Sequence, residues 1–189
     1  IEKRGMEIAA LNCSGNPLSP AEMGELHTKS IYDTAVLAGR LGVEKLVMMS
    51  GLPAGAPGDK TPNWITSTVS WPDYMVETVR YQWEDVAIPW WKKFVEHCKK
   101  HGVKQIAIEE FPCQLVYNPE TLLKLRDAVD PMIGMNMDPS HLIAMGADPI
   151  AAVRALEGCI YHVHGKDARI ERGLCDINGL AESKPVTDT

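Results

Sequence analysis

Three short apolar runs, each ending in residues that bind metals or transfer protons, decide the fold of this chain: IAIEE at residues 106–110, IGMNMDPSH at 133–141 and CIYHVHGKD at 159–167. Apolar runs of this length, bounded by Pro, Gly or Asn, are typical of buried parallel strands. The carboxyl ends of parallel strands open onto one shared face, so we expect a Glu, an Asp and one or two His to meet there. Carboxylate and imidazole groups together suit a divalent metal ion.

The composition bounds the class of protein. The chain has 189 residues, 45% of them hydrophobic, which suffices for one sizeable core, and we expect a single domain over residues 1–189. The formal net charge of −6 disfavours nucleic-acid binding, which depends on Lys and Arg neutralising phosphates. Five scattered Cys without a CxxC pair indicate reduced thiols and a cytoplasmic protein. We expect no signal peptide and no membrane span, since no apolar run approaches ~18 residues.

Strands and helices are predicted to alternate along the chain. Strands are predicted at residues 6–13, 44–50, 103–110, 132–137 and 159–163, and helices at 20–40, 72–102, 118–129, 141–146 and 148–156. Ser19 and Glu22 favour a capping box at the start of the first helix, and Gly42 favours its end. The inward residues of that helix are expected to be Ile31, Ala35, Leu37 and Ala38. Pro89 is expected to interrupt or restart the second helix, and the chain from residue 168 on is polar and unpatterned.

This alternation favours a parallel sheet, either open and doubly wound or part of a closed barrel. No GxGxxG follows the first strand, which counts against a dinucleotide-binding sheet. A long Gly- and Pro-rich loop is predicted at residues 51–72, and its Lys60 lacks the preceding Gly of a phosphate loop. Trp64 and Trp71 in this loop would either stack on a sugar or anchor the loop. The remaining Trp are expected to be packing residues, namely Trp83, Trp90 and Trp91.

The order and spacing of several motifs resemble the sugar phosphate isomerase/epimerase family, the xylose isomerase-like TIM barrels, whose superfamily also holds the type-2 apurinic endonucleases. The resemblance rests on Glu109, DPSH at 138–141 and HVHGKD at 162–167, supported by residues 7–18, 49–59, 82–84 and 116–123. It implies an α/β fold, the (β/α)8 TIM barrel. Residues 6–13 would be the third strand and 159–163 the seventh. Because a barrel takes at least ~200 residues, we expect an incomplete barrel.

The resemblance also implies a site. The family binds one divalent cation, such as Mn, Mg, Co or Zn, through four ligands, and by position Glu109, Asp138 and His164 are three of them. The fourth is absent here, so we expect this chain alone to be weakly active or inactive. Glu109 and His141 would be catalytic. Lys166 and Asp167, with Trp64, would bind the substrate.

The chemistry implied by this resemblance is proton transfer next to a carbonyl. A divalent metal stabilises the enediolate, while a carboxylate within hydrogen-bond reach takes the proton. The expected function is therefore a metal-dependent sugar isomerase or epimerase acting on a small sugar or sugar-like molecule. Two alternatives remain open. One is an apurinic endonuclease-like phosphodiesterase, which the lack of His at 12–14 and 49–51 disfavours. The other is an inactive barrel fragment that only binds metal or forms homo-oligomers through exposed edge strands.

Two of the residues at these strand ends also have simpler structural interpretations. Asp138 is followed by Pro139 and a predicted helix, so it would cap that helix whether or not it binds metal. We expect His162 to face the helices and to be a structural residue.

Overall fold

Five parallel strands form one curved sheet. A computed structural model of the chain describes residues 2–67, 73, 75–181 and 183. The strands pair in sequence order as β1 (Leu11–Asn12), β2 (Lys45–Met48), β3 (Gln105–Glu109), β4 (Ile133–Met137) and β5 (Ile160–Val163). Cα atoms of β3 and β5 come within 8 Å of each other although β4 lies between them, so the sheet curves. Sequence order without a reversal is the arrangement of a TIM barrel and not of a doubly wound sheet.

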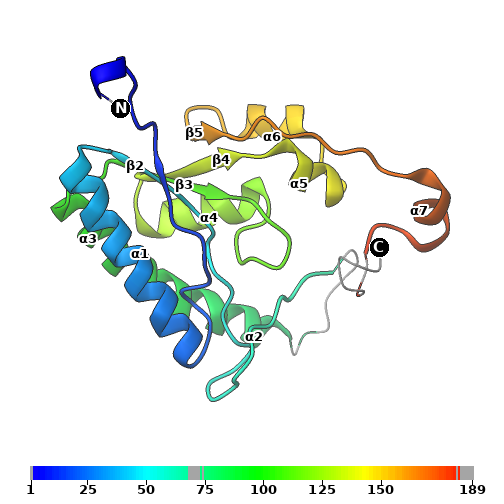
Figure 1. Ribbon diagram of the computed structural model, residues 1–189. Helices are drawn as coiled ribbons and strands as arrows, with labels where there is room; N and C mark the ends of the chain where they lie inside the picture. Colours follow the sequence, from blue (N-terminus) through cyan, green and yellow to red (C-terminus); the bar gives the residue numbers. More distant parts are fainter. Residues whose placement is uncertain (1, 68–72, 74, 182, 184–189) are drawn as a thin grey trace.

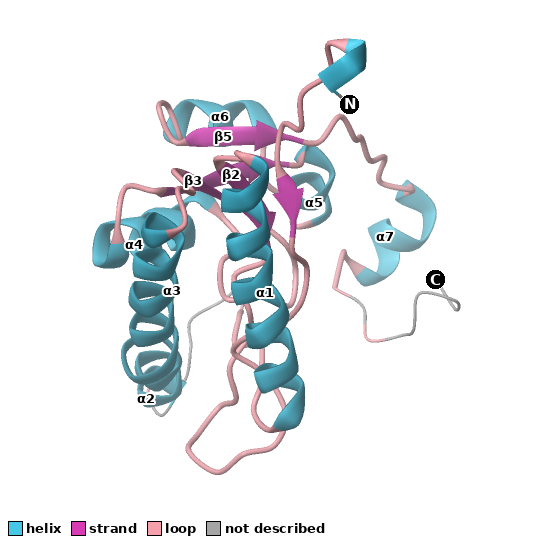
Figure 2. Cartoon of the chain, turned by 60° about the vertical axis from the view of Figure 1, so that its left-hand side comes forward, coloured by secondary structure: helices cyan, strands magenta, loops and turns pink. Residues whose placement is uncertain are grey.

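Helices connect the successive strands, and two further helices lie before β1 and after β5 in the chain. They are η1 (Glu2–Arg4), α1 (Glu22–Leu41), α2 (Met75–Arg80), the π-helical segment η2 (Tyr81–Ala87), α3 (Ile88–Lys100), α4 (Pro119–Val129), α5 (Pro139–Ala144), α6 (Pro149–Ala155) and α7 (Arg172–Asn178). Figures 1 and 2 show α1 and α3 side by side, on the same side of the sheet. None of the helices that the structure describes is both long and apolar enough to cross a bilayer.

The main hydrophobic core lies between the sheet and these helices. Ile106 and Ile108 of β3 are in register with Ile133 and Met135 of β4, and all four side chains are fully buried. Alternate residues of a strand point to opposite faces, so the residues between them, which include Ala107 and Gly134, face the barrel interior. The core thus aligns the strand ends that carry the predicted site.

The Trp residues of η2 and α3 are packing residues, as predicted. Trp83 and Trp91 are buried, and Trp90 packs against the core. The Trp91 indole donates a hydrogen bond to the carbonyl of Ser50 at 3.2 Å, which ties α3 to the end of β2.

The first strand is much shorter than predicted. Of residues 6–13 only Leu11 and Asn12 pair, with Leu46 and Val47 of β2. Met6 is 50% exposed. A strand needs ladder partners, and within the described chain β1 has one on a single side.

The start of α1 also differs from the prediction, whereas its end agrees. The residue before the helix is Ala21 with φ 65°, and Ser19 makes no cap; its hydroxyl donates to the Pro20 carbonyl instead. The helix begins at Glu22, directly after Ala21, so Glu22 is its first residue and not the third, and the spacing that a capping box with Ser19 needs is lost. Gly42, with φ 68°, ends the helix as predicted.

Leu37 is 49% exposed, so its predicted inward position is wrong. The buried stripe of α1 consists of Ile31, Ala35 and Ala38, spaced by four and three residues. Leu37 lies two residues beyond Ala35, roughly 200° around the helix, and therefore faces solvent.

Pro89 restarts a helix without breaking the chain direction. The Ile88 amide donates to the carbonyl of Trp83, five residues earlier, so a π-helical turn leads into α3. Pro89 then occupies the first turn of α3, where a missing N–H costs no intrahelical bond. The predicted loop before this helical region is present up to residue 67, and Trp71 lies outside the described residues.

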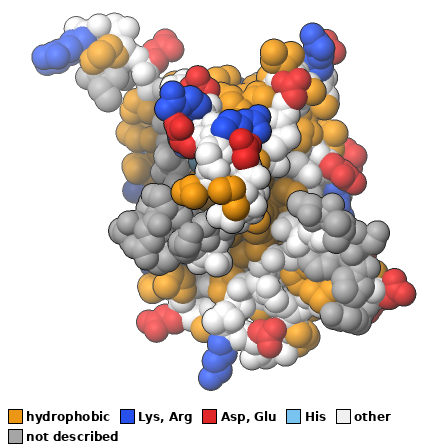
Figure 3. Space-filling model, turned by 90° about the vertical axis from the view of Figure 1, so that its right-hand side faces the viewer, with side chains coloured by type: hydrophobic (Ala, Val, Ile, Leu, Met, Phe, Trp, Pro, Cys, Tyr) orange, Lys and Arg blue, Asp and Glu red, His pale blue; other side chains and the backbone are white. Residues whose placement is uncertain are grey.

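The segment after β5 contains α7, which the polar sequence did not predict. Its residues Leu174 and Ile177 are 74% and 78% exposed, and none of its residues is buried. Figure 1 shows α7 apart from the sheet, and Figure 3 views this side of the molecule, where hydrophobic side chains remain visible at several places. At the β5 edge Val163 is 61% exposed, so an apolar edge faces solvent there.

Candidate metal centre

The structure brings Glu109, Asp138 and His164 together. Glu109 ends β3, Asp138 directly follows β4, and His164 directly follows β5. One ligand atom of each lies within 4.8 Å of the others. The Nδ1 atom of His164 is 3.5 Å from Glu109 Oε1 and 3.7 Å from Asp138 Oδ2. Two carboxylates and an imidazole converging in this way form a group that would hold a divalent cation.

Asp138 serves the fold with one carboxylate oxygen and the site with the other. Its Oδ1 accepts hydrogen bonds from the Ser140 amide at 3.0 Å and the Ser140 hydroxyl at 2.6 Å, which caps α5. Its Oδ2 is buried and faces the site, where the Lys166 ammonium group lies 3.1 Å away and His141 Nε2 lies 3.3 Å away. A buried carboxylate oxygen is costly unless a cation or a donor reaches it, and this one faces the ligand atoms of Glu109 and His164. The residues present therefore fit a metal ion, and the capping interpretation of Asp138 holds as well.

Two further side chains border this group of ligand atoms. His141 Nε2 lies 3.0 Å from Glu109 Oε1 and 3.3 Å from Asp138 Oδ2. Lys166 Nζ lies 3.1 Å from Asp138 Oδ2 and 3.0 Å from His141 Nε2. Burial acts to raise the pKa of Asp138, but hydrogen bonds from Ser140 and Lys166 and the nearby His141 outweigh it, and the pKa lies below its ordinary value. Asp138 is therefore an anion at neutral pH, as a metal ligand must be.

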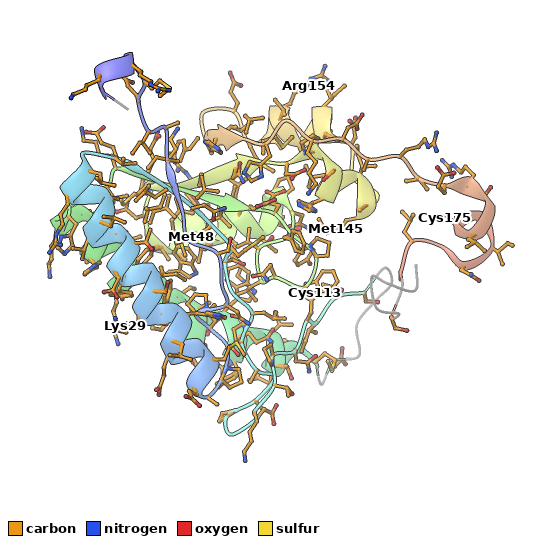
Figure 4. All side chains as sticks on the ribbon, viewed as in Figure 1. Lys29, Met48, Cys113, Met145, Arg154 and Cys175 are labelled. Atoms are coloured by element: carbon orange, nitrogen blue, oxygen red, sulfur yellow. The ribbon has the colours of Figure 1, made fainter. Side chains whose placement is uncertain are left out.

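The ring of Phe111 meets that of His141 edge-on, with 4.2 Å between the ring centroids, and this contact restrains the imidazole. Figure 4 labels Cys113, further along the loop that follows β3, and Met145, which follows α5. Both residues belong to the segments that follow β3 and β4, the strands whose ends carry Glu109 and Asp138.

His162 does not face the helices, so that prediction is wrong. Residues two apart in a strand share one face, and His162 and His164 therefore point the same way. Their rings lie 5.6 Å apart, and His162 is in register with Asn136 of β4. The pKa of His162 is lowered by burial and by the charges of His164 and Lys45.

Two buried polar residues next to the predicted ligands were not predicted as site residues from the sequence. Asn136, two residues before Asp138, is fully buried, and its Nδ2 lies 3.3 Å from both ring nitrogens of His164. Glu110 follows Glu109, is buried, and burial raises its pKa to about 8. Their spacing from the predicted ligands was the only feature of the sequence that pointed to them. Asn136 lies two residues before Asp138, and residues two apart in a strand share one face.

Trp64 lines a cavity apart from the ligand atoms, whereas Asp167 lines another cavity together with His164 and Lys166. Trp64 lines a cavity of about 180 Å³ beside η2 and α4, where its ring meets Tyr117 edge-on at 5.6 Å. That cavity has neither Glu109 nor Asp138 in its wall. Asp167 is exposed, and its Oδ1 accepts a hydrogen bond from the Ala168 amide. The substrate-binding roles of both residues stay predictions.

The chain belongs to the xylose isomerase-like TIM-barrel family. The family model matches residues 1–178. A curated relative, the uncharacterized protein YfiH of Bacillus subtilis (strain 168), is 62% identical over 188 residues. The match covers all of this chain but 60% of that protein, so the chain spans less than two thirds of the length of this relative.

Solved structures agree on the fold. A D-tagatose 3-epimerase-like protein matches with a TM-score of 0.60 at 22% identity, over 88% of this chain and 59% of its own. The IOLI protein, solved with a bound zinc atom, matches with a TM-score of 0.54 at 17% identity, over 82% of this chain and 50% of its own. Parallel strands in sequence order, a family match over most of the chain and these neighbours confirm the predicted fold class.

Proposed function

We propose that this protein is a metal-dependent isomerase or epimerase of a small sugar or sugar-like polyol. The observation that carries the proposal is the meeting of Glu109, Asp138 and His164 at the carboxyl ends of three consecutive strands. The family membership and the epimerase-like neighbour support the same class of chemistry.

A divalent cation held by these three residues, such as Mn, Mg, Co or Zn, would polarise the substrate carbonyl and stabilise the enediolate formed by proton removal. Glu109 would take the proton from the carbon next to the carbonyl. Its Oε1 is held by the His141 imidazole at 3.0 Å, which orients the carboxylate. A base must sit within hydrogen-bond reach of the proton it removes, and a fixed carboxylate at the mouth of the barrel meets that need.

His141 and Lys166 would act on the oxygen atoms of the substrate. Both lie within 3.3 Å of Asp138 Oδ2, so they border the same space as the predicted ligands. An imidazole and an ammonium group there can donate hydrogen bonds to a hydroxyl, a carbonyl or a phosphate. We assign His141 to the reacting oxygens and Lys166, with Asp167, to the rest of the substrate.

The endonuclease alternative is the weaker one. Residues 12–14 and 49–51, at the ends of β1 and β2, contain no His that could add further metal ions. The net charge of −6 also opposes a phosphate backbone. A chain that binds metal without catalysis is the remaining alternative, and the experiment below separates it.

The first test measures binding of Mn²⁺, Co²⁺ and Zn²⁺ by calorimetry in the wild-type chain and in Asp138→Ala and His164→Ala. We expect stoichiometric binding in the wild type and its loss in both variants. Asp148→Ala is the matched control, because Asp148 caps α6 before Pro149 through the Ile150 amide but lies outside the site. It should cost a helix cap, about 1 kcal/mol, and leave metal binding intact.

The second test follows deuterium uptake from heavy water at the carbon next to the carbonyl of ketoses and ketose phosphates, by NMR. Proton removal needs one base, so the assay does not require the full reaction. We expect uptake with the metal-loaded chain and none with Glu109→Gln. Metal binding without uptake from any member of the panel would leave the non-catalytic alternative and refute the isomerase.

A further inference from the structure

Asn136 lies directly behind the predicted metal ligands. It belongs to β4, where it is in register with Glu109 on one side and His162 on the other. Its side chain is fully buried, and its amide contacts His164 at 3.3 Å. A buried amide in the barrel interior, between two strands that each carry a ligand, is placed to influence the geometry of the site.

Among the residues that the structure describes, the Asn136 amide has a hydrogen-bond contact on one side only. Its Nδ2 faces both ring nitrogens of His164, while its Oδ1 is buried and has no partner in the described part of the chain. The nitrogen and oxygen of an Asn amide have nearly the same shape, so their assignment follows from the hydrogen-bond network. Turning the amide by 180° places Oδ1 against the imidazole and gives that oxygen a donor.

The site itself determines which nitrogen of His164 needs an acceptor. Nδ1 is the atom that faces the carboxylates, at 3.5 Å from Glu109 Oε1 and 3.7 Å from Asp138 Oδ2. A nitrogen that binds a metal carries no proton, so in a neutral imidazole Nε2 carries it. The Asn136 amide lies 3.3 Å from both ring nitrogens, so with Nδ1 turned to the carboxylates, Nε2 is the nitrogen available to donate to that amide.

We propose that Asn136 is a positioning residue for the metal centre, with its Oδ1 accepting the Nε2–H of His164. The bond would fix both the tautomer and the ring orientation that present Nδ1 to the cation. Outer partners of metal-bound His often act in this way, and their loss typically lowers metal affinity 10- to 100-fold. The inference rests on the metal centre of the proposed function and not on its sugar chemistry.

The test combines NMR and metal binding. In the zinc-loaded wild-type chain labelled with ¹⁵N-His, we expect a slowly exchanging proton on Nε2 of His164. Asn136→Leu, which has a similar size but no acceptor, should lose that slow exchange and bind Zn²⁺ 10- to 100-fold more weakly. Asn136→Asp, which restores an acceptor, should recover both.

The control is Met135→Leu, because Met135 is the neighbouring buried residue on β4 but faces the helices. It should leave zinc affinity and the Nε2 proton unchanged. Unaltered zinc affinity in Asn136→Leu, or a wild-type His164 with no proton on Nε2, would overturn the inference. The wild-type spectrum decides the point even if Asn136→Leu does not fold. Absence of deuterium uptake from ketoses would refute the proposed function and leave this inference intact.

Discussion

Glu110 is predicted to make the stability of the fold fall with rising pH. Its side chain is 1% exposed, and neither carboxylate oxygen has a hydrogen-bond partner among the described residues. Burial raises its pKa from 4.5 to about 8. Ionisation of such a group in the folded state is costly, because the charge loses its water without gaining a partner.

The direction of the effect follows from where the proton is bound. Below about pH 4.5 the carboxyl group is protonated in both folded and unfolded chains and contributes no pH dependence. From 4.5 to about 8 the unfolded chain loses the proton while the folded chain keeps it, so the free energy of unfolding falls as pH rises. The gap between 4.5 and about 8, at about 1.4 kcal/mol per pKa unit, corresponds to a loss of at most about 5 kcal/mol.

The assay is urea unfolding of the wild type and Glu110→Gln at pH values from 5 to 8. We expect the glutamine variant to gain stability relative to the wild type across this range, because its side chain cannot ionise. Glu157→Gln, at an exposed position, controls for the removal of one carboxyl group. A difference between wild type and Glu110→Gln that stays constant with pH would refute the reasoning.

Three further predictions concern a cap, the core and the thiols. Asn118→Ala should lower the free energy of unfolding by about 1 kcal/mol in urea titrations, since Asn118 forms a capping box with α4; an unchanged midpoint would contradict this. Trp91→Ala should lower the free energy of unfolding by about 3–5 kcal/mol in the same assay, because Trp91 is fully buried. A decrease below about 1 kcal/mol would show that the core around Trp91 is not tightly packed. An aromatic disulfide reagent at pH 8 should label exposed Cys113 in the folded chain. Buried Cys13 and Cys98, whose pKa values burial raises, should react only after unfolding, as peptide mass mapping would show.

Features fixed by local chemistry could be read from the sequence. Asn118 and Asp148 stand before Pro at helix starts, and both form the caps that this pattern predicts. Gly42 ends α1 because its positive φ is cheap only for glycine. β3, β4 and β5 each lie within the predicted runs, since a buried strand needs little beyond a short apolar segment.

Features fixed by distant partners could not be read in this way. The extent of β1 depends on which strands pair with it, and the sequence of residues 6–13 does not contain that information. The entry to α1 depends on the backbone turn at Ala21, whose φ is 65°, and this turn moves the start of the helix to Glu22. The exposed helix α7 has no core contact that would have imposed a periodic pattern on it.

The site was predictable at the level of strand ends but not of side-chain partners. Glu109, Asp138 and His164 meet because parallel strands place their carboxyl ends together, and the sequence shows where each strand ends. The sequence did not single out Asn136, because its contact with His164 crosses between strands in a register that the sequence does not give.

The two roles of the Asp138 carboxylate have a consequence for the motion of the first turn of α5. The Asp138 carboxylate caps the first turn of α5 through Oδ1 and Ser140, and it faces the site through Oδ2. A cation that binds Oδ2 therefore also restrains Oδ1. The Ser140 amide then becomes a reporter of occupancy: its hydrogen exchange should slow when the site is filled. Filling of the site would thus be visible in the backbone of a helix, without any probe on the ligand.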